Sequence, residues 1–194
     1  MKQDLRARTL ADRDAIDPVR RLELAKAIVG HLYDLDRFRD AGAVALYWAA
    51  GSEVSTSGII ARLSEQEERR IFLPFVLNGE LELTEWRPQD PVVTAEYGGM
   101  HPRYRRAVKL DEVDVLVVPG LAFDRRGHRL GSGTGHYDRL LSRLDPRTIR
   151  IGLGYQSQVV DEVPHGSGDE DVHFVATEEG LITCAPVPSG SDQR

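Results

Sequence analysis

The run VDVLVVP, residues 113–119, constrains the fold more than any other segment of the chain. An almost unbroken series of valine and leucine is typical of a strand that is buried on both faces of a sheet. Shorter apolar or alternating runs predict further strands at 43–49, 70–76, 81–86, 148–155 and 172–177. A strand buried on both faces needs helices above and below it. The sequence therefore predicts a layered protein.

Helical patterns occupy the intervening segments, at residues 2–14, 17–35, 57–70 and 136–144. Asp17 is the expected N-cap of the second of these helices, and Pro18 suits its first helical position. We expect the first two helices to be antiparallel. Because strands and helices alternate, the sequence favours an α/β fold, a single-domain layered α/β/α sandwich with a mixed, mostly parallel sheet.

Length and composition support one soluble domain. A chain of 194 residues with 41% apolar residues can build one substantial core and is short for two. We expect the domain to span residues 1–185 and the Pro/Ser/Gly-rich tail, residues 186–194, to be disordered.

Charge and cysteine content narrow the class of partner. The net charge of −6 disfavours a general nucleic-acid or membrane-surface binder, whose field is normally positive. The single cysteine, Cys184, cannot form an internal disulfide, and the start of the chain lacks an apolar signal core. We therefore expect a cytoplasmic protein, a monomer, with no nucleic-acid or membrane partner.

The segment RLGSGTGHYDRLL, residues 129–141, carries three glycines at alternate positions before a helix. Gly131, Gly133 and Gly135 permit positive φ and leave no Cβ in the way of a ligand, and the following helix start offers free N–H groups. Such a loop suits a phosphate. A tight turn without a ligand explains the glycines equally well.

An acidic residue in the first turn of that helix limits which ligand the glycine loop can bind. Asp138 would repel a phosphate unless a cation lay between them, and Mg²⁺ commonly joins one carboxylate to phosphate oxygens. Arg129 could neutralise further charge, because its planar guanidinium matches phosphate oxygens. These residues predict a nucleoside triphosphate with Mg²⁺. The alternative is that Asp138 only complements the helix dipole.

Several ordered motifs resemble one family. Residues 113–141 resemble the signature of the 5-formyltetrahydrofolate cyclo-ligases, in which a strand ends in Pro-Gly and is followed by Phe-Asp, Arg-Leu-Gly and a glycine loop closing on Tyr-Asp. KQDLR near the start resembles the family's Lys-x-x-x-Arg, and GSEVST its Glu-Val-x-Thr. The run from Gly152 to Gly180 resembles its C-terminal part, with Gln158, Asp169 and Thr177.

The resemblance implies an ATP-dependent enzyme that converts 5-formyltetrahydrofolate, with or without a polyglutamate tail, into 5,10-methenyltetrahydrofolate with release of ADP and phosphate. A formamide oxygen is a poor leaving group. Its attack on the γ-phosphate of ATP makes a phosphorylated imidate, which N10 of the folate then attacks. The protein's part in such a transfer is mostly alignment and charge stabilisation.

The resemblance also implies site residues. Arg129 and Asp138 would be catalytic, with Asp138 holding Mg²⁺. Glu53 would bind the pterin, whose ring edge offers two N–H donors to one carboxylate. The residues implied for ATP are Lys2, Arg6, Arg129, Gly131, Ser132, Gly133, Thr134, Gly135, His136 and Tyr137. Without the resemblance, Lys2, Arg6 and Glu53 would be surface charges and Tyr137 a packing residue.

The pattern also departs from the family at three positions. His101 replaces the usual Glu or Gln before proline, although a neutral imidazole can still accept a hydrogen bond from folate. Thr134 and His136 replace residues common in the glycine loop. Tyr97 keeps the usual aromatic residue and could stack on the pterin or simply pack. These changes permit altered substrate preference or weak activity.

Two nearby features have competing explanations. Arg103, Arg105 and Arg106 could meet the glutamate tail of folate, but a solvated basic loop is the simpler interpretation. Phe123 and Asp124 are expected to shape the loop after the central strand, where Asp124 could equally form an Asx-turn.

Three functions therefore stay open. They are the ATP-dependent cyclo-ligase, a non-catalytic or weakly active folate or nucleotide binder on the same scaffold, and another α/β enzyme acting on a sugar phosphate. The joint presence of Lys2, Arg6, Glu53, Arg129 and Asp138 favours the first.

Overall fold

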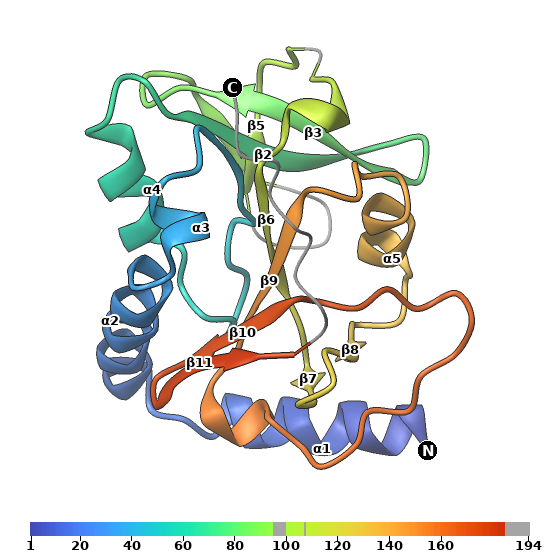
Figure 1. The fold of residues 1–194 in the computed structure, drawn as a ribbon. Coiled ribbons are helices and arrows are strands. Elements are labelled where there is room, and N and C mark those ends of the chain that lie inside the picture. Colours follow the sequence, from blue (N-terminus) through green and yellow to red (C-terminus); the bar gives the residue numbers. More distant parts are fainter. Residues whose placement is uncertain (95–99, 107, 185–194) are drawn as a thin grey trace.

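A seven-stranded mixed sheet forms the centre of the computed structural model, which describes residues 1–94, 100–106 and 108–184 (Figure 1). The strand order is β11-β10-β9-β6-β1-β2-β3. Their bounds are β1 Ala43–Ala45, β2 Arg70–Leu77, β3 Glu80–Trp86, β6 Val115–Pro119, β9 Ile149–Leu153, β10 Phe174–Thr177 and β11 Gly180–Thr183. The predicted fold class is confirmed. The tail expected to be disordered lies outside the described residues.

The five inner strands are parallel, and each edge strand is antiparallel. Each edge strand is joined to its neighbour by a tight hairpin. Between β2 and β3 the turn is Asn78-Gly79, with φ of 52° and 81°. Positive φ at both central residues is the backbone of a type I′ turn, whose twist matches that of the paired strands.

Helices cover both faces of the sheet (Figure 1). Helices α2 (Pro18–Tyr33) and α4 (Ser57–Ser64) lie on one face, and α5 (His136–Leu141) lies on the other. The central strand β6 contributes side chains to the core on each face of the sheet, because successive side chains of a strand point to opposite faces. Val115 and Val117 pack in the core with α2 and α4, whereas Leu116 and Val118 pack in the core with α5.

Helix α1 (Lys2–Asp14) does not pair with α2 as predicted. It crosses the end of the sheet (Figure 1), where it contacts β7 (Ala122–Phe123) and the 3-10 helix η2 (Gln156–Gln158). Only Leu5, Thr9 and Arg13 of α1 are buried. A helix with so narrow an apolar stripe cannot pack along a second helix, so the antiparallel arrangement was wrong.

Several elements are shorter than predicted or were not predicted. The helix expected over 57–70 ends at Ser64, because the polar residues after Leu63 have no apolar side chain to bury. The strand expected over 43–49 ends at Ala45. The unpredicted elements are α3 Asp36–Arg39, η1 Leu110–Glu112, η2, β4 Val92–Thr94, β5 Met100–Pro102, β7, β8 Arg129–Leu130 and β11. No helix among the described residues is long and apolar enough to cross a bilayer.

The ring of Phe123 leaves no room for a side chain at Gly152. This ring is fully buried against the backbone of β9, and a Cβ built on Gly152 would lie 2.4 Å from it. Gly152→Ala is therefore expected to lower the free energy of unfolding by about 1–3 kcal/mol. Urea denaturation measures the change. Gly58→Ala is the matched control, because nothing lies within 4 Å of that added methyl group and alanine favours the helix. Equal stability of the two variants would contradict this packing.

Candidate active site at the carboxyl ends of β1 and β6

The connections of the sheet create a crevice between β1 and β6. After β1 the chain moves to β2 on one side, whereas β6 lies on the other side of β1 and is followed outward by β9 and β10. In open α/β sheets the loops diverge where the strand order reverses, and ligands bind at the carboxyl ends there. A cleft of about 470 Å³ opens at this position.

Four segments line this cleft, which we call the switch-point cleft. They are α1, the loop after β1, the end of β6 with the residues that follow it, and the glycine loop. The lining residues are Gln3, Arg6, Ala7, Leu10, Arg13, Glu53, Pro119, Gly120, Leu121, Arg129, Gly131, Ser132 and Tyr137. The structure thus brings together residues that lie far apart in the sequence, including Arg6, Glu53 and Arg129.

The glycine loop has the backbone that its sequence suggests. Gly133 and Gly135 have φ of 109° and 69°, a region that side chains with a Cβ rarely adopt. A Cβ on Gly131 would lie 2.8 Å from the guanidinium of Arg129. Arg6 donates from Nε to the carbonyl oxygen of Gly131 at 2.9 Å. The loop is therefore a glycine-lined cradle with two arginines beside it, which suits an anion.

Arg129 and Asp138 form an ion pair behind this loop. The Arg129 guanidinium donates to Asp138 Oδ1 at 2.7 Å, and its side chain is only 2% exposed. The backbone N–H of Glu170 also lies 3.4 Å from Oδ1. Among the described residues, the buried Nε of Arg129 has no hydrogen-bond partner. The site thus holds an unused donor and a carboxylate of the kind that Mg²⁺ prefers.

The remaining residues predicted for ATP lie around the cleft. Lys2 forms an ion pair with Asp169 and is not among the lining residues. Gly131 and Ser132 line the cleft, whereas residues 133–136 continue the loop beyond it. Tyr137 packs against the two main cores and also lines the cleft. It can therefore serve in packing and still contact a ligand.

Glu53 is the acid of the cleft. Its Oε2 accepts a hydrogen bond from the backbone N–H of Ala50 at 2.9 Å. Burial raises the pKa of this carboxyl, although the Ala50 N–H and the charge of Arg13 act in the opposite direction. Burial and the nearby Glu53 carboxylate also raise the pKa of Tyr137. Acid and phenol therefore share one poorly solvated pocket.

Two further buried polar residues belong to the site, of which Arg13 was not predicted and Gln158 was named only as part of the family resemblance. Arg13 donates from Nε to Ser52 Oγ at 2.9 Å and lines the cleft. It follows Arg6 by seven residues, so two turns of α1 place both on one face, a spacing that could have identified it. Gln158 donates to the carbonyl oxygens of Gly120 and Leu121 and so holds the end of β6.

The predicted folate contacts are only partly assembled. His101 lies on β5, which packs against β2, and is not among the residues that line the cleft. Tyr97 lies outside the described residues. Of the arginines nearby, Arg103 and Arg105 are exposed, as a solvated basic loop predicts, and Arg105 lies over the ring of Phe75. Arg106 instead forms an ion pair with the buried Asp90.

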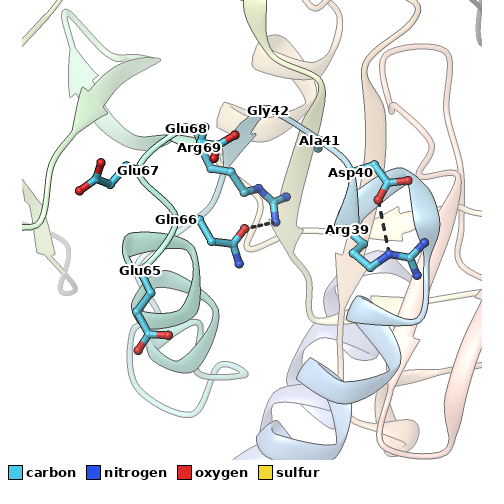
Figure 2. A pocket seen from close by; sticks show the side chains of 9 residues that line it. All are labelled: Arg39, Asp40, Ala41, Gly42, Glu65, Gln66, Glu67, Glu68 and Arg69. Atoms are coloured by element: carbon cyan, nitrogen blue, oxygen red, sulfur yellow. Dashed lines mark hydrogen bonds and ion pairs between the residues drawn. The ribbon is translucent and has the colours of Figure 1, made fainter.

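A second cleft, of about 590 Å³, lies at the opposite end of the strands (Figure 2). Gly42 and Arg69, which line it, directly precede β1 and β2. Figure 2 shows Glu65 and Glu67 pointing away from its centre. The Arg69 guanidinium donates to the carbonyl oxygen of Phe38 and to Gln66. Because its central cation already has partners in the chain, this cleft is the weaker candidate.

Comparisons with known proteins identify the family of the chain. The sequence matches the 5-formyltetrahydrofolate cyclo-ligase family over residues 1–178. It is 30% identical over 190 residues to 5-formyltetrahydrofolate cyclo-ligase of Mycolicibacterium smegmatis, covering 93% of this chain and 96% of the relative. The corresponding protein of Haemophilus influenzae is 29% identical over 169 residues, covering 84% and 90%.

A solved structure is similar along the whole chain. The NMR structure of Aquifex aeolicus 5,10-methenyltetrahydrofolate synthetase superposes with a TM-score of 0.84 at 29% identity, covering 100% of this chain and 96% of that one. The resemblance and the enzyme class expected from the sequence are thereby confirmed. The chain belongs to the 5-formyltetrahydrofolate cyclo-ligase family.

Proposed function

We propose that this chain converts 5-formyltetrahydrofolate into 5,10-methenyltetrahydrofolate with conversion of ATP into ADP and phosphate. The observation that carries the proposal is the arrangement of the switch-point cleft, where a glycine cradle flanked by Arg6 and Arg129 faces the same space as Glu53. One end of the cleft offers positive charge to a triphosphate. The other offers a carboxylate to the N–H edge of a pterin.

The nucleotide end is built for charge stabilisation. Arg6, Arg129 and the glycine loop would hold the phosphates, and Lys2 would reach them by exchanging its present partner Asp169. Asp138 would hold the Mg²⁺ that accompanies ATP, and that ion would neutralise phosphate charge when bound. The attraction between the buried guanidinium of Arg129 and a phosphate would be stronger there than in water, because a site that excludes water screens charges less.

The folate end is built for orientation. Glu53 would accept two N–H bonds from the pterin ring, and Tyr137 would pack beside it. Tyr97 and His101 are further proposed contacts, carried by the family resemblance alone. Holding the formyl oxygen in line with the γ-phosphate is the larger part of catalysis, because alignment converts a bimolecular step into an intramolecular one.

The bonds then change in a balanced sequence. The formyl oxygen attacks the γ-phosphorus and ADP leaves, which forms the phosphorylated imidate. N10 attacks the formyl carbon, phosphate departs with the original formyl oxygen, and the N10 proton is released. Arg129 would stabilise negative charge on the phosphoryl group in both steps.

One assay tests the proposal. The full chain is incubated with 5-formyltetrahydrofolate, Mg²⁺ and ATP, and the absorbance of the methenyl product is followed together with ADP release. We expect one ADP for each methenyl group formed and no product without ATP. Tight folate binding without product would overturn the proposal in favour of a non-catalytic binder, which the replacements at His101, Thr134 and His136 make a specific alternative.

A further inference from the structure

Two histidines and an aspartate gather outside the switch-point cleft. His128, His165 and Asp171 each offer one ligand atom, and these atoms all lie within 4.8 Å of one another. His128 directly precedes β8, whereas His165 and Asp171 come from the segment between η2 and β10. None of the three lines the cleft. The cluster is therefore separate from the proposed ligase chemistry.

A buried carboxylate orients the first histidine. Asp124 is 1% exposed and accepts backbone hydrogen bonds from Arg126, His128 and Val163. Its Oδ2 also lies 2.9 Å from Nδ1 of His128. Because a carboxylate only accepts, this contact places the proton on Nδ1 and leaves the lone pair of Nε2 for another partner. Metal-binding histidines are commonly oriented in this way.

His165 and Asp171 each have an atom that could bind a metal ion. His165 stacks on His128 with ring centroids 4.3 Å apart, and its Nε2 lies 3.1 Å from Asp171 Oδ1. This contact is an ion pair when His165 is protonated but is not a hydrogen bond, and among the described residues the buried Oδ1 of Asp171 has no hydrogen-bond partner. A buried carboxylate oxygen normally has one. A cation between these groups would supply the missing interaction.

We propose that His128, His165 and Asp171 bind one divalent transition-metal ion of the zinc class. Two imidazoles and one carboxylate are a donor set that zinc uses with a fourth position left to water, whereas Mg²⁺ prefers oxygen ligands alone. Tetrahedral zinc holds its ligand atoms about 3.3 Å apart. The exposed side chain of His165 can move to close the remaining difference.

The ion would join two segments that support the catalytic loop. His128 is next to Arg129 in the chain, and the segment that carries His165 and Asp171 also carries Asp169, the partner of Lys2. A metal across these segments restrains both of them in the folded state. Zinc is therefore expected to raise the thermal unfolding temperature, since an ion that binds the native state preferentially stabilises it.

Calorimetric titration of the full chain with Zn²⁺, in excess Mg²⁺, tests the site. We expect one equivalent to bind, and His165→Gln to weaken binding at least about tenfold. Asp171→Asn should do the same. His31→Gln is the matched control, because His31 lies on α2 and contacts the carbonyl oxygen of Thr177. Circular dichroism verifies that each variant is folded.

A further control excludes the thiol. Cys184 Sγ lies 3.8 Å from the carbonyl oxygen of Asp124, near enough to compete for a soft metal. Cys184→Ser should bind Zn²⁺ like the wild type, and Co²⁺ bound in place of Zn²⁺ should show visible bands that disappear in His165→Gln. The proposal is wrong if the wild type binds no Zn²⁺, if His165→Gln binds it equally well, or if only Cys184→Ser loses it.

Discussion

Replacing Asp138 by asparagine is expected to lower kcat at least about 100-fold while leaving the affinity for 5-formyltetrahydrofolate unchanged. Asparagine keeps the size of the side chain but removes the charge that would hold Mg²⁺. It also removes the anionic partner of Arg129, whose guanidinium lies 2.7 Å away. Initial rates with saturating ATP and folate measure kcat, and calorimetry measures folate affinity.

A stability control is needed, because loss of a buried ion pair can unfold a protein. Breaking one partner of such a pair can cost about 3–5 kcal/mol, and the Arg129 side chain is only 2% exposed. Glu80→Gln is the matched control. Glu80 lies on β3 and pairs with Arg139, which is next to Asp138 on α5, but the side chains of Glu80 and Arg139 are both nearly half exposed. We expect it to change stability by less than about 0.5 kcal/mol and kcat not at all. Wild-type kcat in a folded Asp138→Asn protein would refute the role of Asp138.

Glu53→Gln is expected to weaken folate binding about 10- to 100-fold with little change in ATP binding. Hydrogen bonds to an ionised group contribute about 1.5–3 kcal/mol, and glutamine presents only one acceptor oxygen to a ring edge with two donors. Separate titrations with 5-formyltetrahydrofolate and with a non-hydrolysable ATP analogue measure the two affinities. Equal losses for both ligands would contradict a pterin-binding role.

The same variant is expected to unfold at a higher temperature than the wild type at neutral pH. Burial raises the pKa of Glu53 in the folded state above its unfolded value, so stability is lost as the pH rises from the unfolded pKa through the raised pKa. Glutamine has no charge and escapes this cost. Below about pH 4 the carboxyl is protonated in both states, and the difference should vanish. Calorimetric unfolding at several pH values checks this sign.

Much of the sheet could be predicted from local sequence. Residues 113–119 are a nearly continuous apolar run, and the strand they form is central and buried on both faces. The glycines at 133 and 135 likewise indicated a loop that needs positive φ, and both have it. These features follow from periodicity and backbone sterics, which act over a few residues. The short strands β4, β5, β7 and β8 left no such signal.

The packing direction of α1 could not be predicted from its local sequence. Its sequence predicts a helix over residues 2–14, and the helix is there, but its direction depends on which distant surface receives its few buried side chains. Leu5 packs with Ala122, Leu130 and Val163, more than 100 positions along the chain. That contact turns α1 across the sheet end and brings Arg6 to Gly131.

The sequence alone determined the α/β class, the central strand and the glycine loop, because each depends on neighbouring residues whose spacing matches a strand, a helix or a turn. Its ordered motifs also identified the family. Only the tertiary structure decided that Arg13 lines the cleft, that His101 is not among its lining residues, and that His128 meets His165 and Asp171. Contacts of this kind join segments far apart in the chain, and they form only when the whole sheet and its covering helices have closed on one core.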